Sequence, residues 1–270
     1  VYKRQDQRIQ LLLIGFVFNA FLEGAAGFGV PIAICAVLLT QLGFKPLEAA
    51  MYCLVGNAAA GAYGAVGIPV AIVDTLNLSG DVSATEVALI GNLTLGFISF
   101  FVPFLLIFMI DGLKGIKETL PSILVVSVTY TLLQVIMTSF AGPELADIIP
   151  GLAAMVALAL FSSKFQPQNI FRLQKDEEPK HVTKHSFQKI VYAWSPFIIL
   201  TVIVLIWSSS FFKGLFEKNG LLNAFVVKFN VPGTMNDVTH TPNVLTFNFI
   251  AQTGTATVSY THLTLPTNRE

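Results

Sequence analysis

The stretch Phe21-Leu-Glu-Gly-Ala-Ala-Gly-Phe-Gly-Val-Pro31 interrupts a long apolar run with one carboxylate and three glycines. Gly24, Gly27 and Gly29, followed by Pro31, disfavour a regular helix, because glycine is conformationally costly there and proline lacks an amide hydrogen. A second interruption follows at Gly64-Ala-Val-Gly-Ile-Pro69. Both clusters end in Gly-x-Pro, at residues 29–31 and 67–69. The sequence therefore predicts two broken apolar segments that form a pair.

The composition around these breaks is that of a membrane protein. Of the 270 residues, 54% are hydrophobic and 12% are charged, and the mean hydropathy is +0.69. A soluble domain carries about 25% charged residues. The net charge is zero, which gives no electrostatic reason to expect nucleic acid as a partner. We expect the lipid bilayer to surround much of the chain.

Apolar runs of membrane-spanning length recur along the chain. A helix needs roughly 20 apolar residues to cross the hydrocarbon core, and no run shows the alternation of a barrel strand. We predict an all-α, polytopic transmembrane helical bundle with a re-entrant or broken-helix segment. The expected spans are Ile9–Leu22 with Val30–Leu42, Leu47–Val73, Val87–Ile110, Leu120–Phe140, Ile149–Phe161 and Val191–Ser210.

Charges in the connecting segments alternate in sign. Residues 74–86 and 141–148 contain acidic but no basic residues, whereas 111–119 contains two lysines and 164–189 contains six basic residues. Basic residues in short loops mark the cytoplasmic side. Residues 111–119 and 164–189 are therefore expected inside, together with Lys45 and Arg8, and residues 74–86 and 141–148 are expected outside.

Arg8 and Lys45 on one side require residues 9–42 to enter the membrane and return. Two full crossings would need about 40 apolar residues, and this run has 34. We favour a hairpin that turns at residues 23–29. The alternative is one long crossing that places Arg8 on the opposite face.

The breaks are the predicted binding site. Backbone that is freed from helical hydrogen bonding in a membrane must line a cavity or be buried in protein, and paired interrupted segments are typical of transporter sites. Helix N-termini at such breaks present free amides to an anion. A carboxyl group between apolar neighbours, Glu23, is suited to carry a coupling proton. The alternatives are close helix packing through small residues and an interfacial turn that solvates Glu23.

Polar residues in the apolar spans extend this hypothesis. Asn57 and Tyr63 are placed to bond a substrate hydroxyl or carboxylate, or else a neighbouring helix. The predicted substrate-binding set is Gly24, Gly27, Gly29, Pro31, Asn57, Tyr63, Gly64, Gly67 and Pro69. Tyr130 and Gln134 lie one helical turn apart and could face the same cavity, but we expect them to make interhelical contacts.

No metal or catalytic site is predicted. His181 and His185 have metal-ligand spacing, but they lie in a charged loop and favour a solvated role. Cys35 and Cys53 lie in apolar runs and are expected to be buried thiols. The spans hold no histidine and no pair of aspartates, so we predict neither an enzyme nor a cofactor, with the proton as coupling ion.

We expect five consecutive parts along the chain. Residues 1–5 and 258–270 resemble translated adapter sequence and are set aside as a non-native leader and tail, which makes the rest an internal fragment of a longer protein. Residues 6–163 hold the transmembrane helices, including the broken segments 9–42 and 47–73. Residues 164–190 form a cytoplasmic charged loop, and 191–257 a transmembrane helix with an interfacial segment at Phe211–Asn230.

Several blocks, in order, resemble the bacterial L-lactate permease family. They are Phe21–Ile34, Leu42–Leu47, Gly64–Pro69, Asp111–Thr119, Gly142–Leu145 and Ala193–Phe197, within a resemblance over about residues 8–256. The chain departs from the family pattern at two places. Val30 stands where family members commonly have threonine, and Asn57–Ala62 lacks the threonine and proline that usually follow the asparagine.

The resemblance implies a proton-coupled secondary carrier. It would import lactate and related 2-hydroxy monocarboxylates such as glycolate across the bacterial inner membrane, as a multi-pass protein. The alternatives are a carrier for another small organic anion, or a channel or structural membrane subunit. The sequence leaves the oligomeric state open.

Overall fold

The computed structural model describes residues 6–27, 29–75, 82–165, 167, 169–173, 186–216, 220–235, 242–250 and 255. The predicted leader (residues 1–5) and tail (residues 258–270) lie outside the described residues. His181, His185 and most of the loop 164–190 lie outside them too. The chain divides into two units, residues 1–185 and 186–270. We describe each unit by itself.

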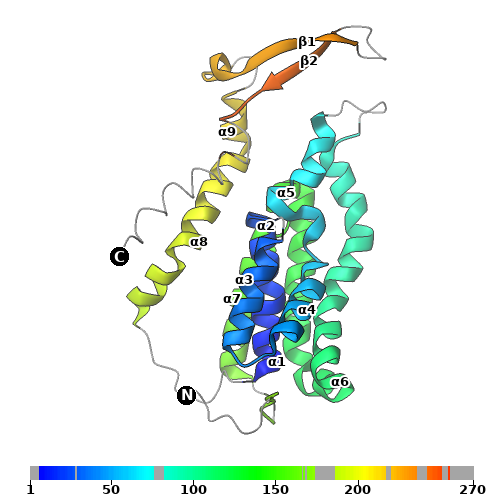
Figure 1. The fold of residues 1–270 in the computed structure, drawn as a ribbon, viewed down its shortest axis with the longest axis vertical. Helices are drawn as coiled ribbons and strands as arrows, with labels where there is room; N and C mark the ends of the chain where they lie inside the picture. The colour runs from blue at the N-terminus through cyan, green and yellow to red at the C-terminus, as the bar shows by residue number, and fades with distance from the viewer. Residues whose placement is uncertain are drawn as a thin grey trace. The chain divides into compact units, whose positions relative to one another are not determined.

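The first apolar run forms a helix that breaks and turns back (Figure 1). Its first arm is continuous through α1 (Gln7–Gln10), a π-helix η2 (Leu11–Phe18) and α2 (Asn19–Ala25), and its second arm is α3 (Val30–Gln41). Gln7 Nε2 donates to Leu42 O at 3.0 Å, so both ends of the run meet. The chain thus adopts the predicted hairpin and not the single long crossing.

The two arms of this hairpin are unequal. The first arm, Gln7–Ala25, has 19 residues and is long and apolar enough to cross a membrane, whereas α3 has 12 residues. The length prediction counted only the apolar residues 9–42, whereas the first helix already begins at Gln7. One arm therefore has the length of a full span and the other about half of it.

The second predicted span, Leu47–Val73, is also broken. It consists of α4 (Pro46–Asn57), the 3₁₀ turn η3 (Gly61–Tyr63), α5 (Gly64–Ala71) and the 3₁₀ turn η4 (Ile72–Thr75). The helices on either side of residues 58–60 are bent by 68°. This pair is long enough for one span only if both pieces are counted together.

Helix α6 (Ala84–Phe140) is 57 residues long but reverses direction. Gly112 has a non-helical backbone (φ 60°, ψ −155°). Beyond it the helix returns beside itself, because Ser99 Oγ donates to Gln134 Oε1 at 2.9 Å and Asn92 contacts Thr138. The two predicted spans and the turn between them at residues 111–119 are confirmed.

The first unit ends with the 3₁₀ turn η5 (Pro143–Leu145) and α7 (Ile148–Lys164), which packs along α6 and α2. Among the described residues, three helices are long and apolar enough to cross a membrane: Gln7–Ala25, Ala84–Phe140 and Pro143–Lys164. The bent pair adds a fourth candidate. With the reversal in α6, this unit is the polytopic helical bundle that the sequence predicts.

The second unit contains a β-hairpin that the sequence analysis did not predict. Helices α8 (Phe187–Ser208) and α9 (Ser210–Gly214) and a 3₁₀ turn η6 (Asn223–Phe225) precede β1 (Val227–Met235) and β2 (Pro242–Phe247). The strands are antiparallel, with Val227 opposite Phe247. Apolar and polar residues alternate from Val227 to Asn230, which is the strand signal that was overlooked.

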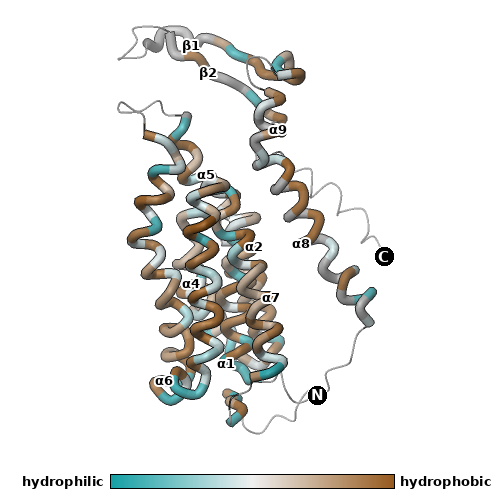
Figure 2. The backbone as a smooth tube through the Cα atoms, turned by 180° about the vertical axis from the view of Figure 1, so that it is seen from behind, coloured by the Kyte–Doolittle hydropathy of each residue, from teal (hydrophilic) through white to brown (hydrophobic). Residues whose placement is uncertain are grey.

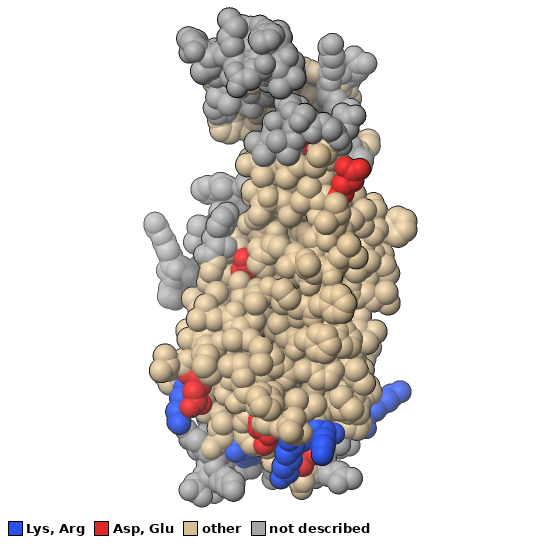
Figure 3. Space-filling view, turned by 90° about the vertical axis from the view of Figure 1, so that its right-hand side faces the viewer, with Lys and Arg blue, Asp and Glu red and all other residues tan. Residues whose placement is uncertain are grey.

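Most of the surface of the first unit between its two ends is uncharged, and the backbone there follows mainly hydrophobic residues (Figures 2 and 3). Lysines and arginines gather at one end in Figure 3. The contacts of Arg8 with Asp111, Glu118 and Asn169 join the predicted cytoplasmic segments there. The alternating loop charges thus correspond to two ends of one bundle.

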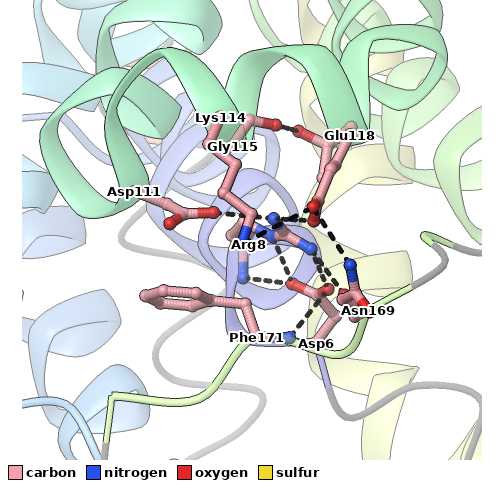
Figure 4. A network of polar contacts seen from close by, with 9 residues as sticks. Asp6, Arg8, Asp111, Lys114, Gly115, Glu118, Asn169 and Phe171 are labelled. Carbon is pink, nitrogen blue, oxygen red and sulfur yellow. Dashed lines mark hydrogen bonds and ion pairs between the residues drawn. The ribbon is translucent and has the colours of Figure 1, made fainter.

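Arg8 lies at the centre of a network of polar contacts at that end of the bundle (Figure 4). Its side chain is 1% exposed and pairs with Asp6, Asp111 and Glu118 at 2.7, 2.7 and 2.8 Å. The guanidinium also donates to Asn169 O and lies 5.4 Å from the centre of the Phe171 ring. A buried arginine needs such partners because an unpaired buried charge is costly. Arg8 therefore joins the start of α1, the turn of α6 and residues 169–171.

Candidate functional site

The two predicted breaks lie against each other. Gly27 has a left-handed backbone (φ 60°), and a Cβ built on it would lie 2.6 Å from Ala65 N and 2.7 Å from Ala65 Cβ. Real Cβ atoms do not approach other atoms so closely, so only glycine permits this contact. The pairing of breaks that the Gly-x-Pro repeat suggested is therefore present in the fold.

The second break has an unusual backbone. Ala65, Val66 and Gly67 all have positive φ angles, of 49°, 59° and 68°. This conformation is costly for alanine and more so for a β-branched residue such as Val66. Such strained segments cluster at ligand sites and switch regions, where the surrounding structure holds them in place. The strain marks residues 64–67 as a candidate functional segment.

A third segment closes on the second break. A Cβ on Gly67 would lie 2.5 Å from the carbonyl carbon and oxygen of Pro143 and 2.8 Å from Glu144 N. The turn η5 was expected in an outer loop, but it folds back onto α5. Three segments that are not regular α-helix, at residues 26–27, 58–67 and 141–147, therefore meet in one region of the bundle.

Glu23 lies in this region and is 5% exposed. Its Oε1 is so near Gly64 that a Cβ there would be 2.5 Å away, and its carboxyl group accepts a hydrogen bond from Asn57. Its Oε2 is buried without a hydrogen-bond partner among the described residues. Asn57 and Gly64 are thus brought to Glu23, as the sequence hypothesis required. The structure does not support an interfacial turn that solvates this carboxyl group.

Asp147 is a second buried carboxyl group, and the sequence analysis missed it as a site residue. It is fully buried, and its Oδ1 accepts from Tyr130 Oη at 2.7 Å and from Gln134 Nε2 at 2.8 Å. A Cβ on Gly24 would lie 2.8 Å from Asp147 Cβ. Tyr130 and Gln134 on one face of an apolar helix were the available signal, because buried polar groups need a partner.

The remaining predicted residues are placed differently. Pro31 is buried, whereas Gly29 and Pro69 are exposed, and a Cβ on Gly29 would meet nothing within 4 Å. The Tyr63 hydroxyl lies 2.9 Å from Ala88 O and 3.1 Å from Asn92 Oδ1. The Tyr63 hydroxyl therefore serves the contact with α6, and its predicted contact with a substrate stays a prediction.

A buried amide next to the site was also missed. Asn19 follows the π-helix and donates to Gly15 O at 3.2 Å and to Cys53 O at 2.8 Å. A Cβ on Gly56 would lie 2.0 Å from Gly15 O, so the backbones of η2 and α4 touch. π-Helical turns are frequent at functional sites. Cys35 and Cys53 are free and buried, as predicted.

The chemistry of the site follows from these side chains. Around the carboxyl groups of Glu23 and Asp147 it places the amides of Asn57 and Gln134 and the phenol of Tyr130. Within the described part of the chain, no lysine or arginine bonds to either carboxyl group. Within the described residues, no group of three or more His, Cys, Asp or Glu side chains is arranged to hold a metal ion. The region is suited to hold protons and to offer amide donors at strained backbone.

The fold and this region define a polytopic helical membrane protein in which two broken helices meet beside buried carboxyl groups. The family model described as L-lactate permease matches residues 3–267, which includes most of the terminal residues set aside above. The chain belongs to the L-lactate permease family. That family is one of permeases and not of enzymes.

Curated relatives agree with this assignment. An L-lactate permease of Halalkalibacterium halodurans is 55% identical over 253 residues, covering 93% of this chain and 46% of the relative. An L-lactate permease of Escherichia coli K12 is 39% identical, covering 93% and 48%, and its glycolate permease GlcA is 42% identical, covering 84% and 42%. The chain thus spans about half the length of the curated relatives it matches. No solved structure matches the chain.

Proposed function

We propose that the complete protein is a secondary active transporter that imports lactate and related 2-hydroxy monocarboxylates, glycolate included, together with protons. The bacterial inner membrane is the proposed location. The observation that carries the proposal is the buried, unpartnered Oε2 of Glu23 at the point where the two broken helices meet. The substrate class comes from relatives whose names specify L-lactate and glycolate.

Charge explains why import would require a proton. A substrate carboxylate cannot approach an ionised Glu23 without repulsion, and an isolated charge in the membrane interior costs about 3 kcal/mol. Protonation of Glu23 removes the repulsion and leaves an O–H donor. Proton and anion then bind together, and neither binds well alone. This reciprocal dependence is the basis of symport.

The substrate would bind where backbone amides are freed. Gly29 and the first turn of α3 border the first break, and residues 64–67 border the second, whereas the Gly27 N–H donates to Leu22 O at 3.4 Å and shapes the break. We assign the substrate carboxylate to these amides and the 2-hydroxyl group to Asn57, whose Oδ1 is buried without a partner in the described part of the chain. The exposed Pro69 and the engaged Tyr63 would shape the break instead of touching the substrate.

The test uses the complete permease in proteoliposomes with labelled L-lactate. An inwardly directed proton gradient is expected to drive accumulation, and collapsing the gradient with a protonophore should stop it. Glu23→Gln should abolish gradient-driven accumulation, whereas Glu48→Gln, which removes a half-buried carboxylate paired with Lys45, should not. Uptake that ignores the gradient, or no uptake of any 2-hydroxy acid, would refute the proposal. Labelled glycolate and acetate then test whether the 2-hydroxyl group is recognised.

A further inference from the structure

Asp147 occupies the N-cap position of α7, but its side chain does not cap that helix. It is the residue that precedes the first turn of α7, where aspartate side chains commonly accept a backbone amide. No such side-chain bond is present, and Oδ1 instead accepts from Tyr130 and Gln134 of α6. The side chain is therefore directed into the bundle.

The second oxygen of Asp147 has no partner. Oδ2 is buried and unbonded within the described residues, as is Oε2 of Glu23. Both side chains are at least nine-tenths buried, at 0% and 5% exposure. A buried carboxylate oxygen without a donor is unfavourable unless it carries a proton or meets one. Two such oxygens in one region point to a ligand that supplies hydrogen, and the simplest is the proton.

Asp147 and Glu23 belong to the same electrostatic environment. Asp147 Cβ lies against Gly24, the residue after Glu23, and the two carboxyl groups interact electrostatically. The other titratable groups that act on Asp147 are the phenols of Tyr130 from α6 and Tyr63 from η3. None of these groups supplies a positive charge. Two neighbouring carboxyl groups in such a place do not both ionise readily.

We propose that Asp147 is a second proton-binding group of the transport site and that it shares the coupling proton with Glu23. This inference rests on the proposed symport function. In it, Glu23 and Asp147 titrate as a coupled pair, so that one proton is held between two sites. Tyr130 and Gln134 position Asp147 through Oδ1, and Oδ2 accepts the proton. The single shared proton moves between Glu23 and Asp147, and its release together with the substrate leaves the pair one proton short until another is taken up from outside.

The experiment compares two modes of transport by the complete permease in proteoliposomes. Exchange of labelled for unlabelled lactate at equal pH needs no net proton movement, whereas accumulation against a gradient does. A proton gradient of about one pH unit supports about tenfold accumulation for one coupled proton. Asp147→Asn is expected to keep exchange within about threefold of wild type and to lose the tenfold accumulation.

Matched variants separate coupling from folding. Glu48→Gln removes a carboxyl group on α4 that pairs with Lys45 and lies outside the Glu23–Asp147 pair, so it should retain accumulation. Asp147→Glu restores a titratable group and should recover accumulation at least in part. If Asp147→Asn and Asp147→Glu lose exchange and accumulation together, Asp147 is structural and the inference is wrong. If Asp147→Asn accumulates lactate like wild type, the inference is also wrong.

Two further outcomes are informative. If a sodium gradient, and not a proton gradient, drives accumulation in wild type, then the assignment of a proton to Asp147 is refuted. If wild type shows neither exchange nor accumulation of any 2-hydroxy acid, the proposed function itself fails. The first result leaves a lactate carrier in place and the second does not, so the two failures are distinguishable.

Discussion

At the scale of single residues, glycines and carboxyl groups define the site. The sequence alone predicted Glu23, Gly27, Gly64 and Gly67 as candidate site residues, because a charge and paired Gly-x-Pro motifs stand out in apolar sequence. Asp147 could not be found in this way, since an acidic residue before a span resembles an ordinary loop residue. Its burial depends on the chain folding back after α6, which local sequence does not encode.

The left-handed segment gives a prediction about stability. Ala65→Gly relieves a positive φ angle, which is worth about 1–2 kcal/mol, but loses a buried methyl group worth about 0.8 kcal/mol. We expect it to be neutral or to stabilise the protein by up to about 1 kcal/mol. Ala154→Gly, in the regular helix α7, should destabilise by about 1 kcal/mol or more. Thermal unfolding of the complete permease in detergent compares the two.

The expected stability changes of Ala65→Gly and Ala154→Gly differ, so comparing the two variants tests the left-handed conformation directly. Both variants replace a buried alanine with glycine, since Ala65 is 6% exposed and Ala154 is 0% exposed. They therefore differ chiefly in backbone conformation. Equal losses of stability in the two variants would show that residues 65–67 are not held in the left-handed conformation.

At the scale of helices, close backbone contact determines the packing of the breaks. Apolar run lengths and loop charges predicted the hairpin of residues 9–42, a return of the chain at residues 111–119 and a helix over Val191–Ser210. They did not predict that the second break bends by 68°, because the direction taken after a break depends on the segments that pack against it. The β1–β2 hairpin was missed because membrane-scale hydropathy obscures a short alternating pattern.

The contact between α4 and η2 yields a prediction from matched glycines. A Cβ on Gly56 would lie 2.0 Å from Gly15 O, whereas a Cβ on Gly61 would meet nothing within 4 Å. Gly56→Ala must separate the two helices and should cost about 1–3 kcal/mol. Gly61→Ala should be neutral or stabilising by up to about 1 kcal/mol. Unfolding midpoints in detergent measure both, and equal effects would contradict this packing.

At the scale of the whole first unit, the Arg8 cluster ties together segments from three parts of the chain. Removal of one partner from a buried ion pair typically costs about 3–5 kcal/mol, because the remaining charges are left uncompensated. Arg8→Ala leaves the carboxylates of Asp6, Asp111 and Glu118 without that cation. We expect a loss of about this size, and a smaller one for Arg8→Lys, which keeps the charge but not the planar fork.

The pH dependence of this cluster has a defined sign. The hydrogen bond from Arg8, with a second from Asn169, lowers the pKa of Glu118 in the turn of α6 below its ordinary 4.5. A lowered folded-state pKa contributes stability that is present above pH 4.5 and is lost as the pH falls through the folded value. The stability gap between wild type and Arg8→Ala should therefore shrink on acidification below that pH. A gap that widened would contradict the ion-pair network.

The orientation of the bundle can be tested by labelling. In a background with Cys35 and Cys53 replaced by alanine, single cysteines at Lys45 and Lys114 should react with a membrane-impermeant maleimide only in inverted vesicles. A cysteine at Glu86 should react in intact cells. Labelling of all three from one side would refute the assigned topology. Cysteines at Gln7 and Leu42 should also cross-link, as the hairpin brings these residues together.

Proton movement during lactate entry tests the transport mechanism most directly. Proteoliposomes that contain the complete permease and a trapped pH-sensitive dye receive external lactate at equal pH, with protein-free liposomes as the control for passive entry. The account predicts that the lumen acidifies faster than in the control, and that Glu23→Gln removes this difference. Labelled lactate that enters wild-type vesicles faster than the control without faster acidification would contradict it.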